Sequence, residues 1–182
     1  MDLSLIYWFN QLWSGTWIDK VSTLISWMPF VVSFWVIVIA LLTWKFPAKR
    51  KKIIIAAIIG FVLFLLTNEF TFKKVLVNEI GIRPRPYVAH QDIIPLGTQY
   101  TDSSFPSSHM AWTLMVLTIL IRAIPGSWVF ALIFALLMGF SRIHNGMHYP
   151  SDVLTGWILW IAYWLIGIWC SKYIHRYYHK KK

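Results

Sequence analysis

Residues 141–152, Ser-Arg-Ile-His-Asn-Gly-Met-His-Tyr-Pro-Ser-Asp, form the polar segment around which the chain is predicted to be organised. The segment holds one arginine, two histidines and one aspartate between two long apolar runs. Ionisable groups at a membrane boundary are costly to bury and usually have a function. His148 and Asp152 are four residues apart, so one helical turn would let the carboxylate accept an imidazole N–H. An oriented imidazole beside Arg142 suits nucleophilic attack on phosphorus. A juxtamembrane loop with incidental polar residues is the simpler alternative.

The composition indicates an integral membrane protein. Of the 182 residues, 58% are hydrophobic and 13% are charged, whereas soluble domains are nearer half apolar and a quarter charged. The length accommodates about five spans of roughly 20 residues each. With no repeat and no separate soluble segment in view, residues 1–182 are predicted to form a single membrane domain. The net charge of +10 indicates basic cytoplasmic loops. It also indicates anionic lipid headgroups, rather than nucleic acid, as partners.

The apolar segments predict an all-α helical bundle with about five transmembrane helices. Residues 3–13 are aromatic and too short to span, which predicts an N-terminal interfacial helix. Residues 17–44 are expected to hold one span, at about 22–44 and bent near Pro29, or alternatively two short re-entrant pieces. The other four spans are predicted at 53–77, 107–123, 127–143 and 152–171.

Basic residues predict the orientation of this bundle. Residues 45–52 carry five positive charges in eight positions and are expected to face the cytoplasm. Arg122, between the third and fourth spans, and the basic tail at 172–182 fall on the same side. The N-terminus and residues 141–152 are therefore expected outside, and the C-terminus inside.

Two further polar clusters fall on the outer side of this topology. Residues 83–86 are Arg-Pro-Arg-Pro, in which the guanidiniums of Arg83 and Arg85 can fork onto phosphate oxygens. A basic external loop is the simpler interpretation of that cluster. Residues 106–109 are Pro-Ser-Ser-His, and a helix that begins there offers free N–H groups to an anion. His109 is then placed to protonate a leaving oxygen, whereas N-capping alone would explain only the serines.

Histidines and arginines without an acidic cage indicate phosphate handling that needs no metal and no cofactor. A zinc site made by His144, His148 and Asp152 is the alternative. It is disfavoured because the nearby arginines would repel a cation and the other two clusters would have no explanation.

Together the three clusters resemble the signature of the type 2 phosphatidic acid phosphatase superfamily of membrane lipid phosphatases. That signature is Lys-x6-Arg-Pro, Pro-Ser-Gly-His and Ser-Arg-x5-His-x3-Asp. The third motif is complete here, and the second has Ser108 in place of the glycine. The first is present at Arg85-Pro86, but Asn78 stands where the lysine is expected. Lys74, one helical turn earlier, is the candidate for the missing charge.

The resemblance implies a role for each matching residue. It implies that His148 is the nucleophile that becomes phosphohistidine, that Asp152 orients it and that His109 protonates the departing oxygen. It also implies that the phosphate is bound by Arg85, Arg142, Ser107 and Ser108. Two further candidates, suggested by their position alone, are Lys74 and Arg83. Arg83 is two residues from Arg85, so in extended backbone the two could contact different phosphates of a diphosphate.

The runs at 85–90 and 139–143 resemble the bacterial undecaprenyl-diphosphate phosphatases of that superfamily. The expected function is therefore hydrolysis of undecaprenyl diphosphate to the monophosphate, at a bacterial inner membrane, with the active site facing outside the cytoplasm. Phosphatidylglycerophosphate phosphatase, lipid A phosphatase and lipid phosphotransferase are alternatives within the enzyme class. A non-catalytic lipid carrier or transporter is the alternative of another class, although phosphate binding alone would not need two histidines and an aspartate.

Overall fold

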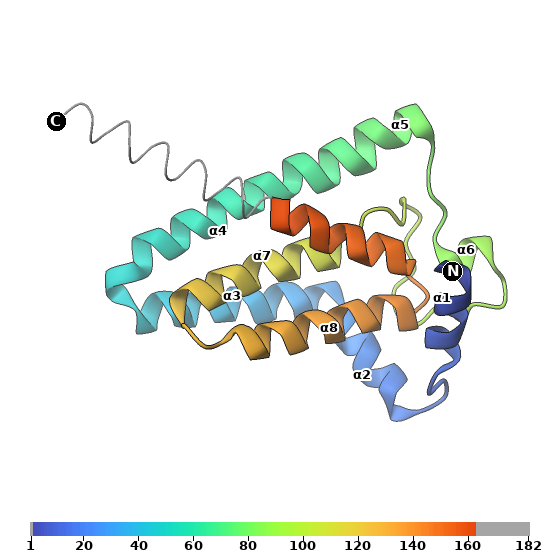
Figure 1. Cartoon of the computed structure of the whole chain (residues 1–182), viewed down its shortest axis with the longest axis horizontal. Helices are drawn as coiled ribbons and strands as arrows, with labels where there is room; N and C mark the ends of the chain where they lie inside the picture. Colours follow the sequence, from blue (N-terminus) through green and yellow to red (C-terminus); the bar gives the residue numbers. More distant parts are fainter. Residues whose placement is uncertain (1, 163–182) are drawn as a thin grey trace.

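Helices make up the regular structure of residues 2–162, the part of the chain that the computed structural model describes (Figure 1). The predicted all-α fold is confirmed, since no strand occurs in that part of the chain. The helices are α1 (Asp2–Gln11), α2 (Trp17–Ser26), α3 (Met28–Lys45), α4 (Arg50–Phe64), α5 (Val77–Ile80), α6 (Pro86–Ala89), α7 (Ser108–Ala123), α8 (Trp128–His144) and a last helix over residues 150–162.

Residues 17–44 form two helices, so the single span expected from residue 22 onward is wrong in its first part. α2 ends at Ser26, and Trp27 is extended (φ −72°, ψ 114°) before α3 begins. Pro29 lies in the first turn of α3 and has no N–H with which to continue the hydrogen bonds of α2. α3 is long and apolar enough to cross a membrane, whereas α2 packs against α8. The bend predicted near Pro29 is thus confirmed, and α3 alone is the span.

The second predicted span lies within one continuous helix of 34 residues, Pro47–Ile80, which is also long and apolar enough to cross a membrane. A 3₁₀ turn, Pro47–Lys49, precedes α4, and a π-helical stretch, Leu65–Leu76, joins α4 to α5. A π-helix bonds i to i+5, so side chains in this stretch leave the α-helical register that the sequence predicts. Gly81 ends the helix with φ 88°, a conformation that favours glycine.

The helices predicted as the third and fourth spans are confirmed as α7 and α8, which are apolar but shorter than the two helices of membrane-spanning length. The fifth, expected at 152–171, is helical over 150–162. Its remainder and the basic tail at 172–182 lie outside the described residues.

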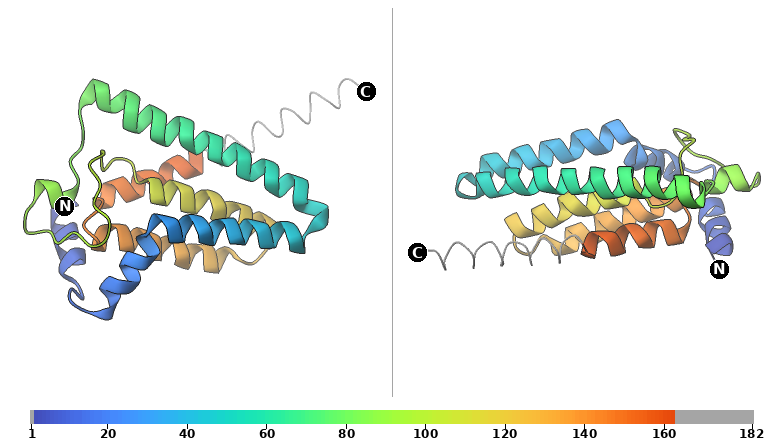
Figure 2. Two further views of the ribbon diagram at one scale, coloured as in Figure 1. Left: turned by 180° about the vertical axis from the view of Figure 1, so that it is seen from behind. Right: turned by 90° about the horizontal axis from the view of Figure 1, so that it is seen from above.

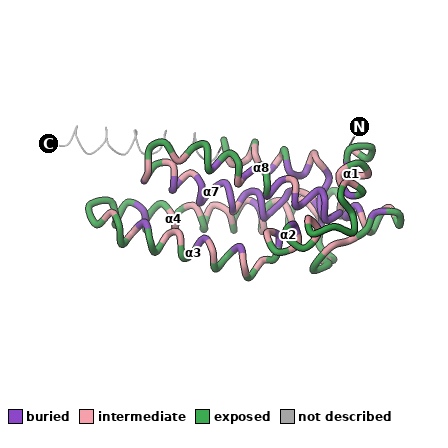
Figure 3. Tube along the Cα trace, turned by 90° about the horizontal axis from the view of Figure 1, so that it is seen from below, coloured by how far each residue is buried: buried purple, intermediate pink, exposed green. Residues whose placement is uncertain are grey.

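The helices pack in two layers, with the hairpin of α3 and α4 on one side and α7, α8 and the last helix on the other (Figure 2). α7 is the central element, because it contacts α3, α4 and α8 and most of its residues are buried (Figure 3). α4 instead exposes more than half of the side chains of Ile55, Ile58 and Ile59. An apolar helix that is exposed in this way fits a surface that faces lipid.

The N-terminal helix α1 covers one end of the bundle. Asn10 Nδ2 donates to the C=O of Ile94 (2.9 Å) and of His144 (2.7 Å), and its Oδ1 accepts the N–H of Ile94 (2.9 Å). Trp8, on the other face, and Trp13, just beyond the helix, are more than half exposed. This arrangement fits the predicted interfacial helix.

The two ends of the bundle differ in charge. The basic turn at 45–52 lies beside the end of α7, where Lys49 Nζ donates to the C=O of Ala123 at 3.1 Å. The long loop at 81–107, α1 and the turn at 145–149 lie at the opposite end (Figure 1). The predicted separation of the three polar clusters from the basic turn is therefore confirmed.

Candidate active site

Three segments that are far apart in the sequence meet at the end of the bundle away from the basic turn. Arg85 Nη1 donates to the C=O of Met147 at 3.0 Å and lies 3.3 Å from His148 Nε2. The N–H of Ser107, immediately before α7, lies 3.4 Å from the C=O of Asp152. The three predicted clusters thus form one site.

A tight turn after α8 positions His148. The N–H groups of Met147 and His148 both donate to the C=O of Arg142, at 3.1 and 3.2 Å. Gly146 makes the turn with φ 69°, and a Cβ added there would lie 2.8 Å from Ile93 Cγ2. The turn therefore needs glycine both for its backbone conformation and for the close approach of the loop before α7.

The hydrogen bonds of His148 define its tautomer. Nδ1 lies 2.6 Å from the C=O of Ser104. A carbonyl oxygen can only accept, so Nδ1 carries the proton and, in the neutral ring, the lone pair is on Nε2. Nε2 is the atom that faces Arg85. The arrangement presents an unprotonated imidazole nitrogen to the cationic side of the site, where it accepts a long hydrogen bond from Arg85.

The surroundings of His148 also keep its ring neutral. Burial, and then the positive charges of Arg142, Arg85 and Lys73, lower the pKa of His148 well below its ordinary value. At neutral pH the imidazole is therefore a nucleophile rather than a cation.

Asp152 does not form the hydrogen bond with His148 that the four-residue spacing predicts. Its Oδ2 lies 3.8 Å from His148 Nδ1 and accepts instead the N–H of Tyr149 at 2.9 Å. The helix begins at residue 150, so Asp152 is at its third position. Its carboxylate caps the N–H of Tyr149, the residue just before the helix. His148 lies before this helix, and the geometry of one helical turn does not apply to the pair. Asp152 therefore lies beside the imidazole without a hydrogen bond to it, while Ser104 orients the ring.

Several buried donors around His148 have no partner within the described part of the chain. Arg142 is 2% exposed and its Nε and Nη2 atoms are unpartnered, as are Nε of Arg85 and the hydroxyl of Ser107. Ser107 also makes no side-chain cap hydrogen bond to α7, which leaves the helix N-terminus open. Buried polar groups normally have hydrogen-bond partners. Guanidiniums and the free N–H groups of a helix N-terminus commonly bind an anion such as phosphate, which would be a partner for these donors.

His109 is held by α2, an element that the sequence interpretation merged into a span. His109 Nε2 lies 2.9 Å from the C=O of Ser26, so Nε2 carries a proton and Nδ1 is left to exchange one. The Ser26 hydroxyl donates to Ser141 Oγ at 2.9 Å and accepts from Asn145 Nδ2 at 3.1 Å. The sequence signal for this contact is the pair Ser22 and Ser26, four residues apart in an apolar segment.

Ser108, which replaces the glycine of the second motif, turns its hydroxyl away from His148. It donates to Glu69 Oε1 at 2.6 Å and accepts from Asn68 Nδ2 at 2.8 Å. The hydroxyl is therefore satisfied by the π-helical stretch, and the contribution left to Ser108 is its backbone N–H.

Lys73 lies beside the site, and the predicted Lys74 and Asn78 do not. Lys73 Nζ forms an ion pair with Asp102 at 2.6 Å, and its charge acts on His148. Lys74 and Asn78 are exposed, with Lys74 Nζ over the ring of Phe70. Lys74 was chosen because it lies one α-helical turn before Asn78. This stretch is π-helical instead, so Lys74 does not lie on the face of the helix that meets the site.

Asp102, on the loop before α7, bridges two cations of the site. Its Oδ1 is 2.5 Å from Arg85 Nη2 and its Oδ2 is 2.6 Å from Lys73 Nζ. Burial alone would raise the pKa of Asp102, but Lys73 and Arg85 outweigh burial and lower that pKa. The carboxylate thus occupies cations that can bind a phosphate.

Arg83 lies next to the site with its guanidinium already engaged. It donates to Asp152 Oδ1 (2.5 Å), Ser151 Oγ (2.9 Å) and Asp2 Oδ2 (2.9 Å), and it stacks 4.3 Å above the ring of Tyr149. These contacts hold Asp152 and the start of the last helix in place, so Arg83 is bound by two carboxylates rather than open to a phosphate.

The alternative zinc site does not form. His144 is fully buried, with Nδ1 2.8 Å from the C=O of Phe9 and Nε2 2.8 Å from Asp19 Oδ1. Both ring nitrogens are used to fasten α1 and α2 to α8, and no cluster of three potential ligands occurs among residues 2–162. His144 is a structural residue.

The chain is similar to known proteins over most of its described length. The sequence profile of the PAP2 superfamily matches residues 51–176. The undecaprenyl-diphosphatase of Sulfolobus acidocaldarius is 30% identical over 158 residues, which are 82% of this chain and 73% of that protein. The undecaprenyl-diphosphatase BcrC of Bacillus subtilis is 36% identical over 141 residues, which are 73% of this chain and 67% of that protein.

The fold is shared with a solved structure. The crystal structure of a transmembrane PAP2-type phosphatidylglycerolphosphate phosphatase from Bacillus subtilis superposes with a TM-score of 0.66 at 23% identity, covering 94% of this chain and 85% of that chain. The superposition identifies the bundle as the membrane fold of these enzymes. With the profile match and the two relatives, it establishes that the chain belongs to the PAP2 superfamily and is a membrane hydrolase of lipid phosphates.

Proposed function

We propose that this enzyme hydrolyses undecaprenyl diphosphate to the monophosphate through a phosphohistidine on His148. One observation carries the proposal: Nε2 of a neutral His148 faces Arg85, in a buried cluster with the unpartnered donors of Arg142 and Ser107. Such a cluster has the parts that phosphoryl transfer requires, namely a positioned nucleophile and fixed charge stabilisation.

In the first step, His148 Nε2 attacks the terminal phosphorus and the bond from that phosphorus to the bridging oxygen breaks. Arg85, Arg142 and the N-terminal N–H groups of α7 stabilise the charge on the transferred phosphoryl oxygens. Once the anionic substrate is bound, His109 takes up a second proton from water on Nδ1; it gives this proton to the departing oxygen, while its Nε2–H stays bonded to Ser26. The lipid monophosphate leaves, and the phosphoryl group remains on His148.

In the second step, water attacks the phosphohistidine and inorganic phosphate is released. His109, now without its Nδ1 proton, takes a proton from that water. The Ser104 carbonyl holds the Nδ1–H of His148 through both steps. Asp152, 3.8 Å from that nitrogen, stabilises the positive charge that the ring carries in the intermediate.

Substrate binding displaces Asp102 in this proposal. Arg85 and Lys73 cannot hold both the Asp102 carboxylate and a phosphate, so the anion of the substrate replaces the anion of the loop. Beside Arg85 lies an open cavity of about 360 Å³, whose walls include Ile82, Tyr87 and Val88. The cavity offers apolar surface next to the cations, as a lipid with a phosphorylated head requires.

Undecaprenyl diphosphate is proposed as substrate because both relatives with that activity align over most of the chain. We expect purified enzyme to cleave it with a kcat/KM on the order of tenfold or more above that for phosphatidylglycerophosphate, lipid A or phosphatidic acid. Phosphate release from each substrate in matched detergent micelles measures this. Preference for phosphatidylglycerophosphate or lipid A would assign the enzyme to that substrate, and transfer of the phosphoryl group to an added lipid would make it a phosphotransferase.

Substitution of the two site histidines tests the covalent mechanism. We expect His148→Ala to abolish turnover and labelling of the protein, and His109→Ala to lower kcat by roughly 10²–10⁴-fold. The measurement is rapid quenching with substrate labelled in the terminal phosphate, followed by analysis for an acid-labile phosphohistidine. His90→Ala is the control, because His90 lies at the same end and contacts only Tyr7 among the described aromatic rings. A labelled His148→Ala protein would contradict the assignment of the nucleophile.

The two neighbouring lysines provide a matched comparison. We expect Lys73→Met to lower kcat/KM by on the order of 10²-fold, as for loss of one transition-state donor, and Lys74→Met to leave it within about twofold. Both changes remove one charge from the same helix, so they differ only in the face affected. The assignment of Lys73 fails if Lys74→Met is the more damaging change.

We also propose that the active site faces outside the cytoplasm of a bacterial inner membrane, because the basic turn lies at the other end of the bundle. In a Cys170→Ser background, cysteines at the exposed positions Thr98 and Thr101 should react with an impermeant thiol reagent in intact cells. A cysteine at the exposed Ala48 should react only after permeabilisation. The opposite labelling pattern would reverse the orientation without changing the chemistry.

A further inference from the structure

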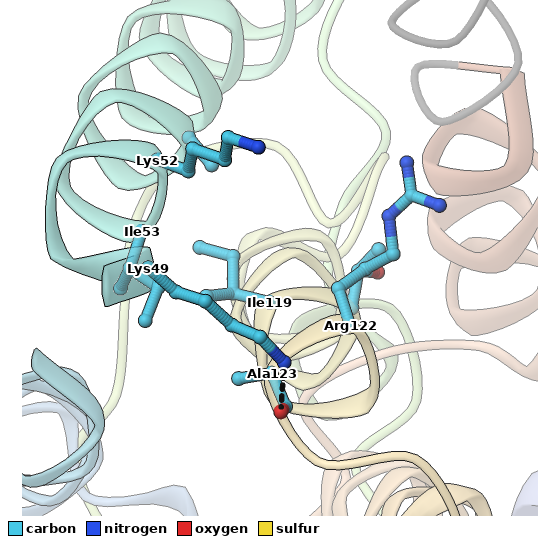
Figure 4. A pocket seen from close by; sticks show the side chains of 8 residues that line it. Lys49, Lys52, Ile53, Ile119, Arg122 and Ala123 are labelled. Carbon is cyan, nitrogen blue, oxygen red and sulfur yellow. Dashed lines mark hydrogen bonds between the residues drawn. The ribbon is translucent and has the colours of Figure 1, made fainter. Parts of the chain in front are cut away.

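A second pocket lies between α4 and α7, at the end of the bundle away from His148 (Figure 4). Its volume is about 620 Å³. The floor is apolar and includes Ile53 and Ile119, and three cations line it, Lys49, Lys52 and Arg122. Lys52 and Arg122 extend from facing helices on either side of the open space (Figure 4).

α4 and α7 are close together at one level and farther apart at another, and the pocket lies where they are farther apart. α4 meets α7 tightly at Gly60, where an added Cβ would lie 2.5 Å from Met115 Sδ. Nearer the basic turn the interface opens into the pocket, and Lys49 Nζ donates across it to the C=O of Ala123 at 3.1 Å. The pocket is therefore a gap between two spans, with one wall at the level of the basic turn.

The positive charge of this pocket has no acidic partner among the described residues. Neither Lys52 nor Arg122 has a hydrogen-bond or ion-pair partner among residues 2–162, where the ion pairs lie at the other end of the bundle. The chain has seven acidic residues, and none of them falls in 20–68, 103–151 or 153–182. No Asp or Glu side chain near these cations in the sequence is available to neutralise them, so they are open to an anion from another molecule.

We propose that this pocket binds the phosphate headgroup of an anionic phospholipid from the leaflet that contacts the basic turn. The phosphate lies between Lys52 and Arg122, and the acyl chains follow the exposed isoleucines of α4, among them Ile55 and Ile59. Basic pockets between transmembrane helices recognise anionic headgroups in this way. A soluble phosphate ester would gain nothing from the apolar floor or from the lipid-facing side of α4.

The test compares two double variants of the full chain that remove the same charge. Lys52→Gln with Arg122→Gln alters the pocket, whereas Lys45→Gln with Lys51→Gln alters exposed residues of the basic turn that do not line it. Each protein is reconstituted in phosphatidylcholine nanodiscs with increasing phosphatidylglycerol, and retained phosphatidylglycerol is counted by native mass spectrometry. We expect the pocket variant to lose about 25-fold in affinity, from two cations worth roughly a factor of five each, and the turn variant to lose far less.

Controls separate this proposal from folding and from the active site. In phosphatidylcholine alone, both variants should unfold at the wild-type temperature and hydrolyse lipid phosphates at the wild-type rate. Equal losses of phosphatidylglycerol in the two variants would show general electrostatic attraction and overturn the proposal. Displacement of the lipid by millimolar glycerol 1-phosphate would also overturn it, because the pocket would then be a site for free phosphate esters. Should the pocket variant be unstable, Lys52→Gln alone is compared with Lys51→Gln under the same criteria.

Discussion

Buried positive charge at one end of the bundle is the constraint on which the site depends. Arg85 and Arg142 are 3% and 2% exposed, and among residues 2–162 the one carboxylate paired directly with either of them is that of Asp102, which lies on a loop and pairs with Arg85. Charge buried in this way is unfavourable without a partner. The same charge keeps His148 neutral and makes the site attractive to an anion. One arrangement of cations therefore prepares the nucleophile and provides the binding energy for the phosphate.

Backbone carbonyls, rather than carboxylates, orient the two site histidines. Ser104 precedes α7 and accepts from His148, and Ser26 ends α2 and accepts from His109. The last carbonyls of a helix have no intrahelical donor. The end of α2 at Ser26, just before the extended Trp27, therefore leaves the Ser26 C=O available to His109. The fold thus selects the tautomers of both rings through the positions of chain segments, and the short helix α2 contributes to the site without carrying any residue of the motifs.

The distribution of charge along the bundle divides the molecule into two functional ends. The described ion pairs gather around the site, where Asp2, Asp102 and Asp152 each contact arginine or lysine. At the other end the cations stand without acids, next to the turn that joins the two longest spans. Interactions inside the protein therefore stabilise one end, and the headgroups of the membrane are available to the other.

Composition and motif order by themselves determined the membrane class, the approximate spans and the residues of the three clusters, because hydrophobicity and residue type are local properties. Tertiary structure decided what those residues contact. Lys73 rather than Lys74 reaches the site because the helix is π-helical there, and Asp152 lies 3.8 Å from His148 without a hydrogen bond because the helix begins between them. Asp102 and Ser26 belong to no motif and act only through contacts across the fold. Spacing along the chain predicts contacts within a regular helix, whereas these contacts depend on where helices end and which segments the packing brings together.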